Sequence, residues 1–263
     1  MEKPKVVILC GGMGTRLKEE TEFKPKPLVM IGDRPILWHI MKIYSHYGFN
    51  DFVLCLGYKG DMIKQYFRDY AFNAYDFELS LKTQKHKTYD AGGIPDWNIT
   101  FANTGLKANS GARIKKIEKY IDGSSFFMTY GDGVADVNIP ELLKFHKLHG
   151  KIGTVTTVRP TIRFGNLSID ANNQITDFTK KSTIHEGWID GGFFVFNKGI
   201  FNYLTEDDSC MLESVPLQSL AKEGQFLCYK HDGYWQCMDT FKDYEQLNEI
   251  WNAGKVPWKI WDK

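Results

Sequence analysis

Apolar positions along the first 150 residues follow two alternating patterns. Short continuous apolar runs, typical of buried strands, occupy residues 5–10, 51–56 and 126–130. Between them, apolar residues recur at helical spacing over 35–47, 60–70, 110–121 and 139–149. Alternating strands and helices favour an α/β fold built on a parallel sheet with right-handed crossover connections.

The pattern changes after Gly153, where strand-like segments follow one another between turn residues. They cover 153–160, 165–170, 174–178 and 187–196, with short helices expected at 198–204 and 214–222. Residues 226–231 and 234–239 predict a final strand pair, and 240–252 a last helix. The polar residues 83–94 predict a solvated loop, a flap near a ligand or a contact with another subunit. Since no linker or repeat divides the chain, we expect one domain over 1–263, with a nucleotide-binding half, 1–150, and a more β-rich half, 151–263.

Composition excludes several classes of protein. Lysine and arginine total 33 and aspartate and glutamate 32, so the net charge of +1 gives no general attraction to nucleic acid or an anionic membrane. The five cysteines form no C-x-x-C pair, and their odd number argues against a disulfide framework. No signal-peptide pattern precedes the first strand, and no apolar run approaches the ~18 residues of a membrane span. These features predict a cytoplasmic protein with reduced thiols.

A glycine-rich turn directly follows the first strand; its residues are Leu9, Cys10, Gly11, Gly12, Met13, Gly14, Thr15 and Arg16. α/β sheets bind ligands at the carboxyl ends of their strands, and glycines let backbone N–H groups face phosphate oxygens. The turn lacks the ending of a P-loop and the third glycine of G-x-G-x-x-G, so both common fingerprints fail. Arg16 can hold phosphate with its planar fork and Lys26 adds a point charge, so the pattern predicts phosphate binding.

Two aspartates lie at the ends of predicted strands, far apart in the chain. Asp132 stands between two glycines after an apolar run, and Asp239 stands at a strand–helix junction. Their ordinary roles would be turn formation and helix capping. Beside a phosphate-binding turn, two carboxylates also suit Mg²⁺, which takes one or two carboxylates together with phosphate oxygens and water. We therefore expect Asp132 and Asp239 to hold Mg²⁺, rather than nearby Asp136 or Asp243.

The glycine-rich turn and several later segments together resemble a known family. The pattern G-G-x-G-T-R-L…K-P-K, starting at Gly11, is similar to the signature of sugar-1-phosphate nucleotidyltransferases. The segments YGDGVADV, RFGNLSI, GGFFVFN, YWQCMDTFKD and VPWKIW extend the resemblance to the C-terminus and narrow it to the branch that joins CTP to glucose 1-phosphate. The resemblance implies a Rossmann-like mixed, mostly parallel sheet flanked by helices and an Mg²⁺-dependent reaction that yields CDP-glucose and pyrophosphate. It also implies homo-oligomers, with hexamers among them, and gives residues 151–263 to sugar-phosphate binding and oligomerisation.

The resemblance assigns roles to single residues as well. Beyond the glycine-rich turn, the expected nucleotide contacts are Lys26, Ser110, Gly111, Arg113 and Gly131. Asp132 and Asp239 match the metal ligands, and Gly165 lies in a motif assigned to the acceptor. Arg16, Lys26 and Asp132 are the expected catalytic residues, because in-line attack by an already ionised sugar phosphate needs positioning and charge neutralisation more than a strong base.

The family's E-K-P motif, which binds the sugar phosphate and its hydroxyls, is altered here. By spacing, Lys180 replaces the glutamate, Lys181 keeps the lysine and Ser182 replaces the proline, while Asp190 replaces an asparagine. Lys181 retains the phosphate-binding charge, but Lys180 only donates hydrogen bonds and cannot accept them from sugar hydroxyls. Asp190 either restores an acceptor or pairs with Lys180. Glucose 1-phosphate and a phosphorylated acceptor with an additional negative charge both stay open.

Two further alternatives stay open. The same scaffold could use UTP or dTTP, since only the segment around Ser110 and Arg113 argues for CTP. A regulatory protein that senses nucleotide sugars without catalysis would be expected to lack some of the charged site residues, and all four are present: Arg16, Lys26, Asp132 and Asp239. No Ser-His-Asp order with a nucleophile elbow occurs, which argues against a hydrolase.

Overall fold

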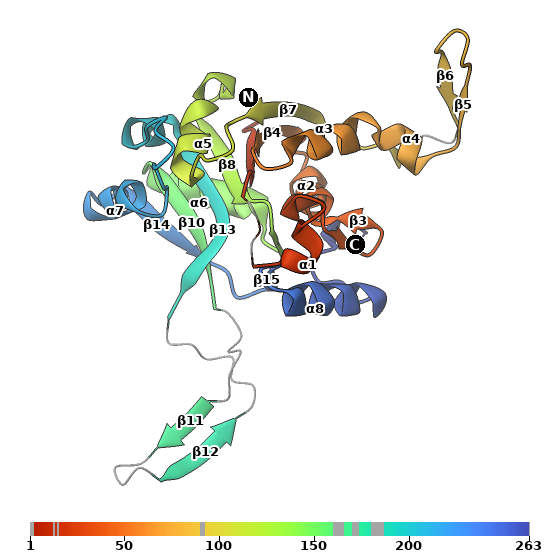
Figure 1. The fold of residues 1–263 in the computed structure, drawn as a ribbon. Coiled ribbons are helices and arrows are strands. Elements are labelled where there is room, and N and C mark those ends of the chain that lie inside the picture. The colour runs from red at the N-terminus through yellow and green to blue at the C-terminus, as the bar shows by residue number, and fades with distance from the viewer. Residues whose placement is uncertain are drawn as a thin grey trace.

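This computed structural model describes residues 3–12, 14, 16–89, 93–159, 166–169, 174–179 and 187–262. Within them, seven strands form a central sheet (Figure 1). In spatial order the strands are β14 (Phe226–Lys230), β10 (Gly153–Val158), β13 (Ile189–Asn197), β8 (Ser125–Tyr130), β1 (Val6–Cys10), β4 (Asp51–Leu56) and β7 (Asn98–Asn103). Strand β13 runs antiparallel to both of its neighbours, and the other four neighbouring pairs are parallel. The expected mixed, mostly parallel sheet is confirmed.

Helices flank the sheet on both faces. The α-helices are α1 (Lys18–Thr21), α2 (Ile36–His46), α3 (Gly60–Arg68), α4 (Tyr70–Ala74), α5 (Ser110–Lys116), α6 (Ile139–His149), α7 (Val215–Lys222) and α8 (Phe241–Asn252), and the 3₁₀ helices are η1 (Lys26–Leu28), η3 (Glu118–Tyr120), η4 (Lys198–Tyr203) and η5 (Ile260–Asp262). Because successive strand side chains point to opposite faces, Val6 and Ile8 of β1 join a cluster with α2, α3 and α6, whereas Val7 joins one with α5, η4 and α7. No helix in the described part of the chain is long and apolar enough to cross a membrane.

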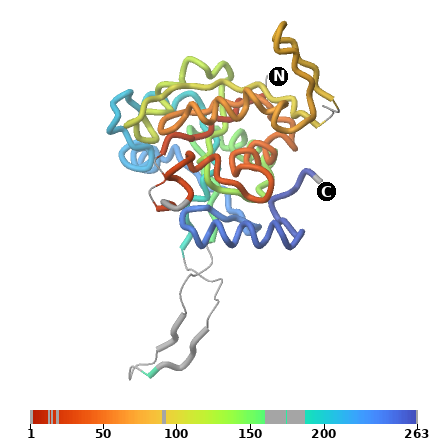
Figure 2. Tube along the Cα trace, turned by 45° about the vertical axis from the view of Figure 1, so that its right-hand side comes forward, coloured from red at the N-terminus to blue at the C-terminus, as the bar shows by residue number. Residues whose placement is uncertain are grey.

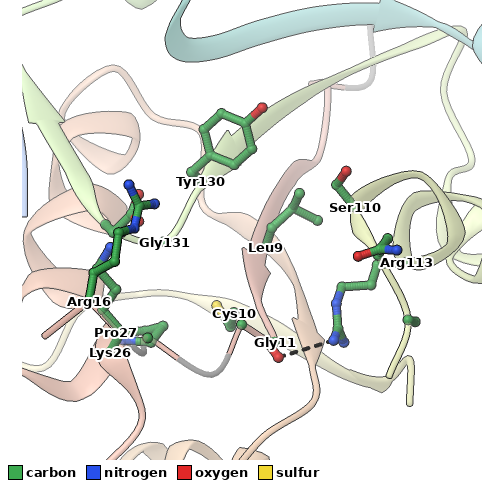
Figure 3. Close-up of a pocket in the computed structure, with 15 residues that line it drawn as sticks. Leu9, Cys10, Gly11, Arg16, Lys26, Pro27, Ser110, Arg113, Tyr130 and Gly131 are labelled. Atoms are coloured by element: carbon green, nitrogen blue, oxygen red, sulfur yellow. Dashed lines mark hydrogen bonds and ion pairs between the residues drawn. The ribbon is translucent and has the colours of Figure 1, made fainter. Parts of the chain in front are cut away.

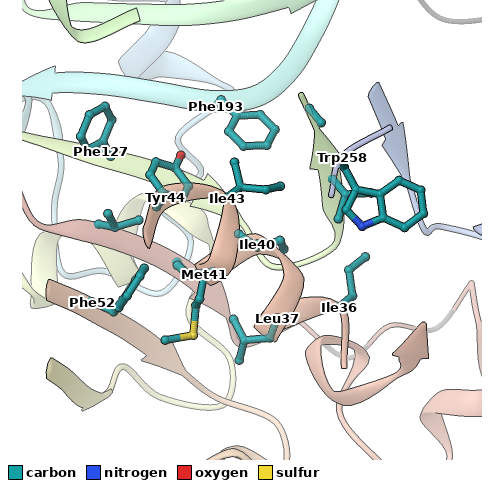
Figure 4. Packing of buried hydrophobic residues seen from close by; sticks show 14 of the residues in the cluster. Ile36, Leu37, Ile40, Met41, Ile43, Tyr44, Phe52, Phe127, Phe193 and Trp258 are labelled. Atoms are coloured by element: carbon teal, nitrogen blue, oxygen red, sulfur yellow. The ribbon is translucent and has the colours of Figure 1, made fainter. Parts of the chain in front are cut away.

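Helix α2 contributes most of its apolar side chains to the larger cluster (Figure 4). Pro35 precedes the helix, which suits a helix start because its φ is already near the helical value. Apolar residues recur every three or four positions, so Ile36, Ile40 and Ile43 are fully buried. Trp258 from the C-terminal tail is also fully buried, close to the ring of His39 on α2. The tail therefore completes the core around this helix.

His39 is a buried histidine whose two ring nitrogens both have partners. The Ile31 carbonyl can only accept, so Nε2 carries the proton and donates to it at 3.0 Å. Trp258 Nε1–H donates to Nδ1 at 3.5 Å, which leaves the ring neutral. Burial lowers the pKa of His39 from 6.5 to about 4.

Acid is expected to destabilise the fold through His39. In the unfolded chain the His39 ring binds a proton below pH 6.5, whereas in the folded chain it stays neutral until the pH approaches about 4. The stability that neutral His39 contributes is therefore fully present above pH 6.5 and is lost between these two values. The loss should total about 3 kcal/mol. Urea unfolding between pH 7 and pH 4 measures it, with His39→Gln as control, because glutamine keeps a donor for Ile31 and does not titrate. Equal pH dependence in both proteins would contradict this role.

Four two-stranded ribbons complete the described fold. They are β2 (Met30–Ile31) with β3 (Arg34–Pro35), β5 (Phe77–Leu79) with β6 (His86–Thr88), β9 (Gly133–Ala135) with β15 (Trp235–Cys237), and β11 (Asn166–Ile169) with β12 (Ile175–Thr179). The β5–β6 hairpin projects away from the body of the molecule in both views (Figures 1 and 2).

Several sequence-based expectations about elements were wrong. Residues 226–231 and 234–239 do not pair with each other: after α7 crosses over, β14 joins the sheet edge parallel to β10, and β15 pairs with β9. The expected loop 83–94 contains strand β6, because residues 86–88 find partners in β5. The helices expected over 60–70 and 110–121 end at Arg68 and Lys116, and each is followed by a separate short helix.

Candidate functional site

A cavity of about 320 Å³ opens at the carboxyl ends of β1 and β8 (Figure 3). Its walls are the turn after β1, the start of η1, the start of α5 and the turn after β8. The residues expected from sequence that line it are Leu9, Cys10, Gly11, Gly12, Gly14, Arg16, Lys26, Ser110, Arg113, Gly131 and Asp132. The fold thus brings segments more than 100 residues apart to one edge of the sheet.

A few of the expected site residues are placed differently or lie outside the described part of the chain. Gly111 does not line the cavity; a side chain there would meet Cys210, against which the start of α5 packs. The residues outside the described part are Met13, Thr15, Gly165, Lys180 and Lys181.

Arg113 is buried and holds the backbone of the glycine-rich turn by hydrogen bonds. Only 5% of it is exposed, and its guanidinium donates to the carbonyls of Gly11, Leu56, Gly105 and Leu106 and to the Thr104 hydroxyl. Burial lowers the pKa of Arg113 without neutralising it, because guanidinium remains charged under any ordinary condition. In this geometry Arg113 fixes the backbone that faces the cavity, and its direct contact with CTP stays a prediction.

Gly11→Ala is expected to destabilise the protein by roughly 2 kcal/mol. A Cβ at Gly11 would lie 2.1 Å from Arg113 Nη1, and the hydrogen bonds of Arg113 prevent that group from moving aside. Gly12→Ala is the matched control, since a Cβ there meets nothing within 4 Å. Thermal unfolding midpoints compare the two, and equal midpoints would contradict the packing argument.

Lys26 joins the two aspartates that the sequence singled out. Its Nζ lies 2.7 Å from Asp132 Oδ2 and 2.7 Å from Asp239 Oδ1, and its side chain is 11% exposed. Arg16 Nη1 lies 3.1 Å from the other oxygen of Asp239, Oδ2. Burial alone would lower the pKa of Lys26, but the two carboxylates outweigh it and raise the pKa above its ordinary value. Two cations therefore face two carboxylates at one side of the cavity.

Backbone pairing places Asp239 beside Asp132. Strand β15 pairs with β9 so that Cys237 lies opposite Gly133, and the Met238 N–H donates to the Asp132 carbonyl at 2.8 Å. Asp239 follows directly, at the point where the chain turns into α8. The ribbon that the sequence did not predict is thus the one that assembles the charged cluster.

Asp243 fixes the backbone that carries Asp239. Its Oδ2 accepts from the backbone N–H groups of Asp239 and Thr240 at 3.1 and 2.9 Å. Thr240, and not Asp239, is the N-cap of α8, in a capping box with Asp243. The carboxylate of Asp239 is therefore not used as a helix cap.

The charged cluster fits a hard divalent cation. One oxygen from Asp132 and one from Asp239 both lie 2.7 Å from Lys26 Nζ, so the two carboxylates converge on one positively charged point at the cavity wall. No group of three or more His, Cys, Asp or Glu side chains suited to a metal occurs among the described residues. Two carboxylates are nevertheless the set that Mg²⁺ takes when substrate phosphates supply the other oxygens.

A smaller pocket of about 50 Å³ lies next to the cavity, and Tyr130 and Asp132 line both. Asp190 belongs to the smaller pocket, and its Oδ1 accepts the Gly192 N–H at 2.6 Å. Although Asp190 is partly exposed, desolvation of its carboxyl and the nearby charge of Glu213 raise its pKa to about 6, against the lowering effects of the Gly192 N–H and the Tyr130 hydroxyl. Asp190 is thus a carboxylate at the wall of a second, adjoining site.

Sequence reasoning missed two polar side chains at the junction of these pockets. Tyr130 ends β8 directly before Gly131, and its place at the carboxyl edge of a strand was a usable signal. Glu213 accepts hydrogen bonds from the Tyr130 hydroxyl and from Ser110 Oγ, both at 2.6 Å. Glu213 carried no sequence signal, because a glutamate before a short helix is usually solvated.

Comparison with known proteins gives consistent matches. The profile of the family described as "Nucleotidyl transferase" matches residues 5–253. "Glucose-1-phosphate cytidylyltransferase" of Salmonella typhi is 44% identical over 259 residues, covering 98% of this chain and 100% of the relative. The Bacillus subtilis protein named "Probable glucose-1-phosphate cytidylyltransferase" is 43% identical over 257 residues, with the same coverage. Among solved structures, HddC from Yersinia pseudotuberculosis shares the fold, with a TM-score of 0.66 and 23% identity over 95% of this chain and 100% of that chain.

Proposed function

The chain belongs to the nucleotidyl transferase family and, through relatives 44% identical over nearly its whole length, to the glucose-1-phosphate cytidylyltransferases, and from this premise we propose that it joins CTP to α-D-glucose 1-phosphate, giving CDP-glucose and pyrophosphate. The observation that carries the proposal is the convergence of the glycine-rich turn, Lys26 and Asp132 on one cavity beside a second pocket, with Asp239 paired to Lys26 behind the cavity lining. One pocket would take the nucleotide and the other the sugar.

The charges of the cavity suit a triphosphate. The backbone N–H groups near Gly12 and Gly14 can face phosphate oxygens, and Arg16 and Lys26 bring positive charge to the same wall. Asp132 and Asp239 would hold Mg²⁺, which supplies neutralisation of phosphate charge when bound. Arg16, 73% exposed at its side chain, can swing from Asp239 to the outgoing pyrophosphate.

The reaction forms one P–O bond and breaks another. A phosphate oxygen of the sugar attacks the α-phosphorus of CTP, and the bond from that phosphorus to the β-phosphate oxygen breaks. The attacking oxygen is already ionised near neutral pH, so the protein need not remove a proton. What remains is alignment of the two substrates across Tyr130 and neutralisation of charge by Lys26 and Arg16.

A pyrophosphate-release panel tests this function. CTP, UTP, dTTP and GTP are each paired with glucose 1-phosphate, glucose 1,6-bisphosphate and glycerol 3-phosphate. We expect CTP with glucose 1-phosphate to be fastest. A faster reaction with UTP or dTTP would overturn the base assignment, and a faster reaction with the bisphosphate would favour the acceptor with an additional negative charge. If no pair of nucleotide and acceptor releases pyrophosphate, the result would favour a regulatory protein that binds nucleotide sugars without catalysis.

We also propose that residues 1–263 form one domain that assembles into homo-oligomers. One sheet containing strands from both halves supports the single domain. The projecting β5–β6 hairpin carries exposed apolar side chains, Phe77, Leu79 and Leu81, which supports self-association. Light scattering coupled to size exclusion measures the assembly, and a monomer at micromolar concentration would contradict it.

A further inference from the structure

Tyr130 stands between the two pockets, and two carboxylates reach its hydroxyl. Glu213 Oε1 lies 2.6 Å from it and Asp190 Oδ2 lies 3.4 Å from it. A phenol has one hydrogen and can donate a strong hydrogen bond to only one of them. The distances assign the hydrogen to Glu213. Asp190 Oδ1 already accepts the Gly192 N–H, so among the described residues Oδ2 keeps its accepting capacity toward the smaller pocket.

Glu213 is itself held in place from the nucleotide side. Ser110 Oγ donates to Glu213 Oε2 at 2.6 Å, and the Leu212 N–H donates to Ser110 Oγ at 2.9 Å. Ser110 begins α5 and lines the larger cavity, whereas Tyr130 ends β8 (Figure 3). Glu213 therefore ties the start of α5 to the end of β8 without lining either pocket itself.

We infer that Glu213 is a positioning residue for the transfer reaction: it holds the Tyr130 hydroxyl away from Asp190, so that Asp190 Oδ2 can accept a hydrogen bond from a hydroxyl of the phosphorylated acceptor. This inference rests on the proposed function for its acceptor. Without Glu213, a small shift of the Tyr130 hydroxyl from its distance of 3.4 Å would let it donate a hydrogen bond to Asp190 Oδ2. It would then compete with the acceptor hydroxyl for that oxygen. A third acid, Asp132, also lines the smaller pocket, and its Oδ2 is engaged by Lys26 at 2.7 Å.

Glu213→Ala is expected to raise the KM for α-D-glucose 1-phosphate about tenfold, as loss of a hydrogen bond to a charged group would. The change in kcat should be much smaller. Glu213→Gln keeps an amide oxygen for the Tyr130 hydroxyl and should stay close to wild type. Glu206→Ala, which removes an exposed glutamate from the same segment, is the matched control and should change neither constant.

The decisive variant combines Glu213→Ala with Tyr130→Phe. Phenylalanine has no hydroxyl to compete for Asp190, so the double variant should recover the acceptor KM of Tyr130→Phe alone. A merely structural role for Glu213 predicts the opposite, with losses that add or worsen. Additive losses, or an unchanged KM in Glu213→Ala, would overturn the inference.

An NMR titration of the Asp190 carboxyl separates failure of this inference from failure of the proposed function, because it needs no turnover. The signal is assigned with Asp190→Asn, and the wild-type pKa is expected at about 6. Glu213→Ala should lower that pKa, since a repelling charge is lost and the phenol turns to donate to Asp190; adding Tyr130→Phe should raise it again. If wild-type protein releases no pyrophosphate but the titration behaves so, the proposed function fails and the positioning stands. If adding Tyr130→Phe to Glu213→Ala leaves the pKa of Asp190 unchanged, the positioning role of Glu213 is contradicted, whether or not the enzyme releases pyrophosphate.

Discussion

Lys26→Met is expected to lower kcat/KM for CTP by roughly 10²–10³-fold, the size of effect seen when one charge-stabilising donor is removed from an active site. Lys26 Nζ lies at the wall of the larger cavity, 2.7 Å from each of two carboxylates, and little solvent reaches it to screen its charge. Methionine retains much of the length and packing of the lysine stem but not the charge. The loss should therefore appear in the rate of pyrophosphate release and not only in nucleotide affinity.

The control for Lys26 lies two residues away. Lys24 carries the same charge, pairs with Glu20 at 2.8 Å and does not line the cavity, so Lys24→Met should leave the rate nearly unchanged. Removing Lys26 also leaves Asp132 and Asp239 facing each other, so the unfolding midpoint is measured alongside. A rate loss no larger than the fraction unfolded, or an equal loss in both variants, would contradict a role in transfer.

Asp132→Asn and Asp239→Asn are each expected to abolish most Mg²⁺-dependent turnover, by roughly 10³-fold at saturating substrates. Each asparagine keeps the shape of the side chain but removes one of the two charges that converge at the cavity wall. Chelation with EDTA should inactivate the wild-type enzyme, and added Mg²⁺ should restore it. The double variant should lose little more than either single variant, because the two carboxylates act as one site.

Asp136→Asn is the matched control for the two aspartates. Asp136 pairs with His231 at 3.0 Å and accepts the Tyr234 N–H at 2.7 Å, away from the cavity lining. Its loss should lower stability without changing the Mg²⁺ requirement. Full turnover of Asp132→Asn with Mg²⁺ would show the assignment of the metal site to be wrong.

The sequence predicted the sheet-forming runs and one side of the candidate site. Strand β4 and helix α6 match their expected bounds, because an apolar run and a helical period are local signals. Lys26, Asp132 and Asp239 were each chosen from local chemistry, and the structure brings all three within hydrogen-bonding distance. Such residues can be found from sequence because a glycine turn or a strand end marks the edge of an α/β sheet.

What the sequence did not predict depends on long-range pairing. The β9–β15 ribbon joins two short segments about 100 residues apart, and nothing within either segment specifies its partner. Glu213 is the clearest example: its role comes entirely from Ser110 and Tyr130, which are 103 and 83 residues away. Arg113 was assigned to the nucleotide, and its hydrogen bonds to the Thr104 hydroxyl and to the carbonyls of Gly105 and Gly11 could not be predicted, because only the folded chain brings these groups together.

The buried tail has a consequence for the order in which the protein is made. Trp258 packs against His39, which lies 219 residues earlier in the chain, and Asp239 completes a cluster begun by Lys26. A ribosome therefore releases Lys26 and His39 long before it releases Asp239 and Trp258. During synthesis the charged cluster and the core around α2 both stay incomplete until these later residues have emerged. A nascent chain that stops before Asp239 lacks both contacts.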